Sequence, residues 1–375
     1  MVDSAAMTVK MGIVGLPNVG KSTLFNALAS GGAEAANFPF CTIEPNVGVV
    51  PVPDARLARL AEIFGSKQCL HATLEFVDIA GLVKGASKGE GLGNQFLSNI
   101  RQTDAIAHVV RCFDDENVVH VHGAIDPIGD VEVVETELGL RDIETVEKRL
   151  VKGVKLTRSG GAAAISAKAE VALLTRVVER LGEGLPVRGM ELSDKEEPLL
   201  EELQLLTAKP VLFLANVSEE HAGSPEDSGD FVKLSELAKT RNADVVAVSA
   251  AIESEVAQLA AEDRAEFLET LGLEEPGLNR VIRSSYKLLG LLTYLTAGPK
   301  EARAWTVRAG AKGPEAAGVI HSDFEKYFIR AEVMKFEDLD ALGSEAAVKA
   351  AGRLRVEGKE YVAQDGDVMN FLTGA

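Results

Sequence analysis

One eight-residue stretch near the start of the chain constrains the fold more than any other feature. It reads Gly15-Leu16-Pro17-Asn18-Val19-Gly20-Lys21-Ser22 and matches GxxxxGK[ST] at every fixed position. The apolar residues 9–14 before it predict a strand, and residues 21–29 after it predict a helix. In such a turn, backbone N–H groups converge on phosphates and the helix N-terminus adds positive potential. The chain is therefore predicted to hold a nucleoside triphosphate.

Further apolar runs predict that this strand belongs to a doubly wound α/β sheet. They cover residues 74–77, 105–110, 211–215 and 244–248. Helical patterns separate most of them, which is typical of buried parallel strands with crossover helices. The predicted fold class is a P-loop NTPase domain of the α/β type.

Two helical patterns interrupt this α/β alternation. Apolar residues recur at helical spacing over residues 134–154 and again over 171–181, and Ser159-Gly160-Gly161 lies between the two patterns. This predicts an antiparallel helical hairpin inserted into the domain. Ser193 with Glu196 has the spacing of a capping box and predicts a helix that runs through Leu205.

After residue 286 the pattern changes to short apolar runs, punctuated by Gly298-Pro299 and Gly313-Pro314. This predicts a small mixed α+β domain at the C-terminal end. The predicted boundaries are 7–128 and 208–285 for the two parts of the nucleotide-binding domain, 129–207 for the inserted helical domain and 286–375 for the last domain.

Several residues are predicted to contact the phosphates and a magnesium ion. Lys21 supplies a point charge for the β and γ oxygens, and Ser22 is a predicted magnesium ligand. Asp78, in Asp78-Ile79-Ala80-Gly81, follows an apolar run, where switch NTPases place the aspartate that holds magnesium. Thr42, in the Pro-bounded segment 37–45, is the third predicted magnesium ligand. The predicted phosphate-binding residues are Asn18, Val19, Gly20, Lys21, Ser22, Thr23 and Gly81.

Asn216-Val217-Ser218-Glu219 follows another predicted strand, where translational and Ras-like GTPases carry NKxD. In that motif the aspartate accepts two hydrogen bonds from guanine. Here the lysine is replaced by Val217 and the aspartate by the longer Glu219, which should impair guanine recognition and leave adenine acceptable. The predicted base-binding residues are Asn216, Val217, Glu219, Ser249 and Ala250.

Composition limits the possible partners and compartments. The net charge of −18 argues against indiscriminate nucleic-acid binding, so RNA would need a local basic patch. Residues 148–158 contain five basic side chains and no acid, although this pattern alone favours a solvated helix face somewhat more than an RNA contact. No secretory signal or membrane span is recognisable, and the three cysteines lack CxxC spacing. We expect a soluble cytoplasmic protein with reduced thiols and no membrane partner.

Across nearly its whole length the chain resembles the YchF/Obg-like ATPase family. The resemblance rests on the P-loop stretch and on Phe38-Pro39-Phe40-Cys41-Thr42, Val77-Asp78-Ile79-Ala80-Gly81-Leu82-Val83, Asn216 to Glu219, Thr296-Ala297-Gly298-Pro299-Lys300-Glu301, Ala317-Gly318-Val319-Ile320-His321-Ser322-Asp323-Phe324 and Glu357-Gly358-Lys359-Glu360-Tyr361. It implies a G domain with a helical insertion, followed by a TGS domain of β-grasp fold. The end of the chain, residues 371–375, departs from the family pattern in lacking the customary extended last strand.

The resemblance also implies an activity and partners. It implies a monomeric, magnesium-dependent ATPase that prefers ATP over GTP and acts with the ribosome, on its large subunit, in translation or the stress response. Two alternatives stay open. One is a nucleotide-gated ribosome-binding module with incidental hydrolysis, and the other is a GTPase translation factor.

The residue that positions the attacking water is not obvious from the motifs. Many switch GTPases use a glutamine just after DxxG, and Leu82 occupies that place here. The resemblance implies that the loop histidine His120 replaces it as the catalytic residue, with His122 a weaker candidate. Asn18 resembles the asparagine that binds potassium in potassium-stimulated relatives, and a loop-shaping role is the alternative.

Overall fold

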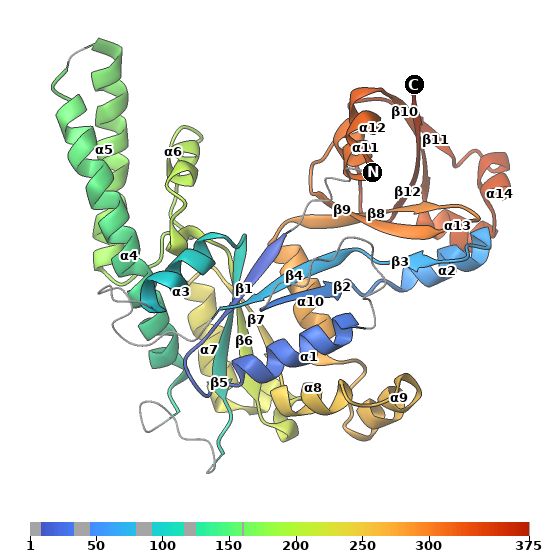
Figure 1. The fold of residues 1–375 in the computed structure, drawn as a ribbon, viewed down its shortest axis with the longest axis horizontal. Helices are drawn as coiled ribbons and strands as arrows, with labels where there is room; N and C mark the ends of the chain where they lie inside the picture. The colour runs from blue at the N-terminus through green and yellow to red at the C-terminus, as the bar shows by residue number, and fades with distance from the viewer. Residues whose placement is uncertain (1–8, 34–45, 80–91, 116–124, 160, 375) are drawn as a thin grey trace.

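A computed structural model describes residues 9–33, 46–79, 92–115, 125–159 and 161–374. Two six-stranded sheets organise these residues, and a long helical hairpin extends from one side of the molecule (Figure 1). Thr42, Gly81, Leu82 and the histidines at 120 and 122 lie outside the described residues. Within the described ranges, no helix combines the length and apolarity needed to cross a membrane.

The first sheet has the strand order β2-β4-β1-β5-β6-β7. Its strands are β1 (Lys10–Val14), β2 (Val47–Pro51), β4 (Thr73–Asp78), β5 (Ala105–Cys112), β6 (Val211–Val217) and β7 (Asp244–Val248). All neighbours are parallel except β2, which runs antiparallel to β4 at one edge. The five predicted strands and their parallel arrangement are confirmed.

Helices cover both faces of this sheet, as the α/β pattern predicts (Figure 1). They include α1 (Lys21–Ala33), α3 (Leu92–Arg101), α7 (Gly229–Thr240), α8 (Ala250–Val256) and α10 (Gly277–Leu288), and α9 (Ala261–Thr270) packs against α8. The P-loop turn lies between β1 and α1, and α1 begins at Lys21, the lysine of the GxxxxGK[ST] motif. The predicted helix over residues 21–29 is confirmed and continues to Ala33.

The hairpin consists of α4 (Pro127–Leu156) and α5 (Gly161–Gly182). Asp126 begins α4 because its side chain accepts a hydrogen bond from the Gly129 amide at 3.1 Å, and Pro127 suits the first helical turn. The two helices pack against each other along their length, which confirms the predicted antiparallel hairpin (Figure 1).

The helix predicted to run from Ser193 through Leu205 is shorter than predicted. The Glu196 carboxylate accepts the Ser193 backbone amide at 2.9 Å, so one half of the capping interaction forms. However, residues 194–196 are a turn, and α6 covers only Glu197–Glu202. Pro198 in the first turn favours this later start, and Gln204 at φ 49° breaks the helical path before Leu205.

Buried polar groups fix the hairpin root against the first sheet. The Asp142 carboxylate, which is fully buried, accepts hydrogen bonds from the Leu206 amide at 2.9 Å and from the Thr207 amide at 2.8 Å and hydroxyl at 2.7 Å. Nearby, Glu135 on α4 forms a buried ion pair with Arg188. The direction of the hairpin is therefore set by polar groups that are largely shielded from bulk water.

The second sheet has the strand order β11-β10-β12-β8-β9-β3. Its strands are β3 (Cys69–Leu70), β8 (Leu291–Ala297), β9 (Ala302–Arg308), β10 (Phe328–Lys335), β11 (Arg355–Glu357) and β12 (Asp367–Thr373). Its helices are α11 (Gly313–Ile320), α12 (Ser322–Lys326), α13 (Phe336–Leu342) and α14 (Glu345–Ala350). The predicted mixed α+β character of this region is confirmed.

The expectation that the chain lacks an extended last strand is wrong. β12 is an inner strand that pairs antiparallel with β10 from Asp367 to Thr373 and also contacts β8. Phe371 packs edge-on against Tyr294 and against Phe328, which anchors the final residues in the core of the second sheet.

The strand β3 belongs to the chain segment between β2 and β4 of the first sheet, yet it completes the second sheet. Cys69 and Leu70 pair in parallel with Ala302 and Arg303 of β9. Helix α2 (Ala55–Phe64), which precedes β3, lies beneath the second sheet (Figure 1). The two sheets are thus joined through one short segment of the nucleotide-binding region.

Candidate nucleotide-binding site

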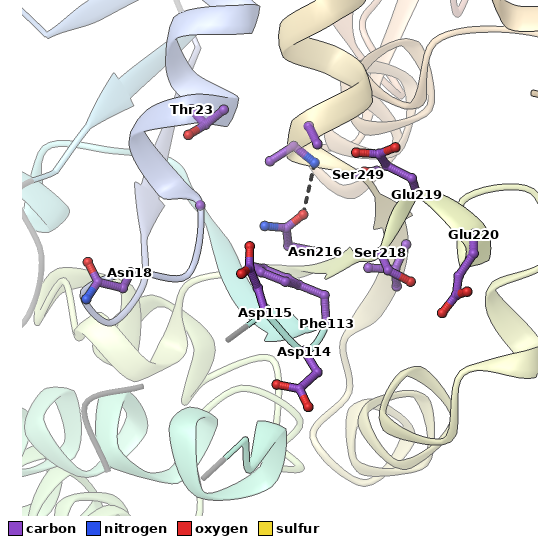
Figure 2. Close-up of a pocket in the computed structure, with 14 residues that line it drawn as sticks. Asn18, Thr23, Phe113, Asp114, Asp115, Asn216, Ser218, Glu219, Glu220 and Ser249 are labelled. Atoms are coloured by element: carbon purple, nitrogen blue, oxygen red, sulfur yellow. Dashed lines mark hydrogen bonds between the residues drawn. The ribbon is translucent and has the colours of Figure 1, made fainter. Parts of the chain in front are cut away.

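A cavity of about 690 Å³ opens where several parallel strands of the first sheet end. The turns that follow β1, β5, β6 and β7 all contribute to its wall, as expected at the carboxyl edge of a doubly wound sheet. Figure 2 shows how these residues lie around the cavity. The lining residues are Asn18, Gly20, Thr23, Phe113, Asp114, Asp115, Asn216, Val217, Ser218, Glu219, Glu220, Ser249, Ala250 and Ala251.

Two glycines of the P-loop are required by close packing. Gly20 has φ of 91°, and a Cβ there would lie 2.2 Å from the Asn216 Nδ2 atom. A Cβ on Gly15 would lie 2.8 Å from the Val109 carbonyl oxygen. The backbone can therefore turn tightly against β5 and β6 only where side chains are absent.

Asn216 links the P-loop to the opposite wall of the cavity. Its Nδ2 atom donates to the Val19 carbonyl at 2.9 Å, and its Oδ1 atom accepts from the Ala250 amide at 2.9 Å, the dashed line in Figure 2. The side chain is only 3% exposed, so both bonds are protected from water. Asn216 thereby holds together the two turns that flank a bound nucleotide.

Lys21 and Asp78 form an ion pair beside the start of α1. The side chains are 10% and 19% exposed, so the pair lies within the protein but can still be reached from the P-loop. A carboxylate and the neighbouring Ser22 hydroxyl are hard oxygen ligands of the kind that magnesium takes in nucleotide sites. The donor chemistry at this position therefore fits a magnesium ion. Within the described ranges, no group of three or more His, Cys, Asp or Glu side chains could hold a metal.

The structure brings together many of the residues predicted from the motifs. All five predicted base-binding residues line the same cavity as Asn18, Gly20 and Thr23 of the P-loop. Asn18 has φ of 64° and lies on the bend of the loop, apart from the strand-end residues in Figure 2. Thr42, Gly81 and His120, predicted for magnesium, phosphate and catalysis, cannot be placed because they lie outside the described residues.

The motif analysis missed one wall of the cavity, formed by Phe113, Asp114 and Asp115. These residues follow β5, which runs two residues beyond the predicted run 105–110. No motif marks them. However, β5 lies between β1 and β6 in the sheet, and the residues after a strand in that place must reach the same edge as the P-loop.

The fold and this cavity define a P-loop nucleoside triphosphatase of the kind built on a switch-GTPase scaffold. The family described as 50S ribosome-binding GTPase matches residues 10–142, and YchF-GTPase_C, described as a protein of unknown function, matches residues 291–373. The chain belongs to the YchF family, whose curated members carry the name ribosome-binding ATPase. The predicted enzyme class, a P-loop NTP hydrolase, is that of the family.

Individual relatives match over nearly the whole chain. Ribosome-binding ATPase YchF of Bacillus subtilis (strain 168) is 53% identical over 365 residues, which cover 97% of this chain and 99% of the relative. The protein of the same name from Escherichia coli O157:H7 is 54% identical over 366 residues, covering 98% and 99%. The solved structure of the Schizosaccharomyces pombe YchF GTPase is 39% identical with a TM-score of 0.87, covering 99% of this chain and 100% of that one.

Proposed function

We propose that this chain is a magnesium-dependent switch ATPase that acts on the ribosome in the cytoplasm, in translation or the stress response. The observation that carries the proposal is the cavity, which joins the P-loop to a base-side wall built on Asn216, Val217 and Glu219. The printed names of the relatives support ATP hydrolysis and ribosome binding, although the S. pombe structure carries the name GTPase. The choice of base must therefore be argued from the cavity itself.

The donors and acceptors around the cavity favour adenine. Guanine carries an acceptor oxygen at the position where adenine carries a donating amino group. The Ala250 amide already donates to Asn216 and is not available to the guanine oxygen, and the longer Glu219 stands where an aspartate would accept two hydrogen bonds from guanine. Val217, which replaces the usual lysine, is 2% exposed and offers an apolar surface. An unpaired polar edge on the wrong base costs about 1–3 kcal/mol, which corresponds to a preference of roughly 5-fold to 150-fold.

Competition titration with ATP and GTP tests this preference. We expect tighter binding of ATP by the wild type, and a shift toward GTP in the double variant Val217→Lys with Glu219→Asp. The conservative variant Ser218→Ala, between the two changed positions, serves as a control for disturbance of the turn. Equal or reversed affinities in the wild type would rule out the ATP preference and favour a GTPase translation factor.

Phosphate binding is assigned to Lys21 and the backbone of the P-loop. Ser22, Asp78 and Thr42 would hold a magnesium ion, which would supply positive charge to neutralise the phosphate oxygens. Lys21 then divides its charge between Asp78 and the incoming phosphates. We expect Lys21→Ala to remove most of the ATP affinity measured by calorimetry, and Ser22→Ala to weaken mainly the magnesium-dependent part. Unchanged affinity in Lys21→Ala would exclude the P-loop as the phosphate site.

Leu82 has no group that can orient water, and the family resemblance implies that His120 takes this role, so catalysis is assigned to His120. We expect His120→Ala to lower single-turnover hydrolysis more than tenfold with ATP affinity within about threefold. Asn18 is assigned to a potassium ion, so replacing potassium by sodium should slow the wild type but not Asn18→Ala. A normal rate in His120→Ala would shift the water-positioning role to the backbone or to the cation near Asn18.

The hairpin end is the proposed ribosome or RNA contact, together with the C-terminal domain. Lys148, Lys152, Lys155 and Arg158 are exposed there, whereas Arg149 is paired with Glu170 at 2.6 Å. Apolar side chains accompany them, with Val151 59% and Ile165 72% exposed. An acidic protein that concentrates free basic groups and apolar groups at one projecting end is suited to an anionic surface.

Ribosome co-sedimentation at several salt concentrations tests this surface. We expect the double variant Lys152→Glu with Lys155→Glu to lose binding, and wild-type binding to fall steeply with salt because counterions are released. The matched control Lys239→Glu with Lys287→Glu makes the same charge change at exposed positions on α7 and α10. Equal binding by both double variants would eliminate the hairpin surface.

Turnover with and without ribosomes separates an enzyme from a nucleotide-gated binding module with incidental hydrolysis. We expect ribosomes to raise the rate of ATP hydrolysis by the wild type. If ribosomes bind the ATP-loaded form more tightly than the ADP-loaded form and turnover stays unchanged, the binding module is the better description.

A further inference from the structure

The cavity wall that no motif marks, Phe113 to Asp115, is organised by a buried arginine. Arg111 is the penultimate residue of β5 and is 1% exposed, although a guanidinium carries a permanent charge. Its Nε atom donates to the Phe113 carbonyl at 3.1 Å, and an Nη2 atom lies 3.4 Å from the Asp115 carbonyl. One side chain therefore holds two carbonyls of the loop that follows its own strand.

Arg111 also contacts the aromatic ring of this loop. The guanidinium carbon lies 4.6 Å from the centroid of the Phe113 ring, within the range of a cation–π contact. Because the guanidinium is buried, water screens its side of the contact little. The ring is thereby fixed between the core and the cavity that it lines.

The sheet register places this arginine beside the residue that joins the other two walls. Arg111 pairs with Asn216 across β5 and β6. Asn216 fixes the P-loop and the Ala250 turn, whereas Arg111 fixes the Phe113–Asp115 turn. Three of the four turns around the cavity are thus held by two neighbouring polar side chains at one level of the sheet.

We propose that Arg111 is a positioning residue for nucleotide binding, which holds Phe113 as the face on which the base stacks. The inference rests on the proposed nucleotide-binding function and deepens it. A planar guanidinium can donate in two directions and face a ring at once, whereas a lysine ammonium is a single compact group. Since Arg111 holds the Phe113–Asp115 turn, its effect should fall on the base half of the nucleotide and spare the phosphate half.

The test compares ATP with tripolyphosphate, which has the phosphates but no base, in the full-length protein with magnesium. We expect Arg111→Lys to weaken ATP binding at least tenfold in calorimetry while tripolyphosphate binding stays within twofold. Arg188→Lys is the matched control, because Arg188 is also buried and also donates to a backbone carbonyl, that of Arg241 at 3.0 Å, away from the cavity. This control should lower the melting temperature and leave the ratio of the two affinities unchanged.

A second variant keeps the test decisive if Arg111→Lys does not fold. Phe113→Leu keeps an apolar side chain but removes the ring, and we expect the same selective loss of ATP affinity. In the double variant the loss should be less than the sum of the two free-energy changes, because Arg111 acts through Phe113. Equal losses for ATP and tripolyphosphate, or unchanged ATP affinity in a folded variant, would overturn the proposal.

The outcome is distinguishable from a failure of the proposed function. If the wild type binds GTP and not ATP, the base preference is wrong. The comparison then uses GTP against tripolyphosphate, because an aromatic face stacks with either purine. If the wild type binds tripolyphosphate as tightly as either nucleotide, the base makes no contribution and the role of Arg111 is overturned as well.

Discussion

The helical hairpin and the second sheet are attached to the nucleotide-binding sheet by different kinds of contact. At the hairpin root, buried side chains such as Glu135 and Asp142 supply the contacts. At the second sheet, backbone pairing of β3 with β9 is joined by surface ion pairs, Arg56 with Asp365 and Arg59 with Asp340, both 2.7 Å long. Buried charges are costly to unpair, whereas backbone pairing tolerates many side chains. Single substitutions of the buried root charges should therefore cost more stability than single substitutions of these surface ion pairs at the second sheet.

The largest expected effect tests the ion pair at the hairpin root. Glu135→Gln leaves the buried Arg188 without its carboxylate, which should lower the free energy of unfolding by about 3–5 kcal/mol. Urea denaturation followed by circular dichroism measures the change. Glu132→Gln, at an exposed position on the same helix, is the matched control. A loss below about 1 kcal/mol would mean that the root does not depend on buried charge.

A somewhat smaller effect is expected at Asp142. Asp142→Ala leaves the Leu206 and Thr207 amides without their acceptor, which should cost about 2–3 kcal/mol. Hydrogen exchange should show faster exchange at these two amides and not at β3. Glu147→Ala, exposed on α4, provides the comparison. Slow exchange at both amides in Asp142→Ala would show that other groups hold the root.

Acid should lower the stability of the folded protein through His108, which lies on β5 of the first sheet. Burial, with a smaller contribution from Arg188, lowers the pKa of His108 from its ordinary value to about 3. Between about pH 6.5 and 3 the unfolded chain binds a proton at this residue and the folded chain does not, so stability falls as pH falls. From pH 7 to pH 5 this residue should cost about 2 kcal/mol.

Denaturation midpoints at the two pH values, compared between wild type and His108→Leu, check this pH dependence. His108→Leu should lose the part of the pH dependence of stability that comes from His108. Phe213→Leu removes the ring 5.5 Å from His108 but keeps the imidazole, so it should retain the slope. Identical slopes in all three proteins would contradict the assignment.

The smallest effects are expected where the second sheet attaches. The Ser66 hydroxyl donates to the Gly298 carbonyl at 2.7 Å, and Ser66→Ala should cost about 1 kcal/mol or less. Arg59→Ala should not change the unfolding midpoint measurably, because that ion pair is exposed to solvent. A large loss of stability in either variant would contradict the difference expected between the hairpin root and the attachment of the second sheet.

The parts of the molecule that repeat a pattern were predictable from the sequence. The strands of the first sheet and the two hairpin helices carry long apolar periodicity, and the P-loop has a fixed spacing. The strand β3 has only two residues and no periodicity, so its pairing with β9 depends on contacts distant in the chain. Phe113 was missed for a related reason, because its place at the cavity is set by the strand order and by Arg111 and not by a local motif.

The pairing of β3 with β9 has a consequence for how the protein is made. Residues 69 and 70 leave the ribosome long before residues 302 and 303, so the edge of the second sheet can close only late in synthesis. Until then the backbone groups of β3 that pair with β9 remain exposed to solvent. A separately expressed fragment covering the matched family segment 291–373 would lack β3 and expose β9 as a free edge, with the tendency of such edges to associate.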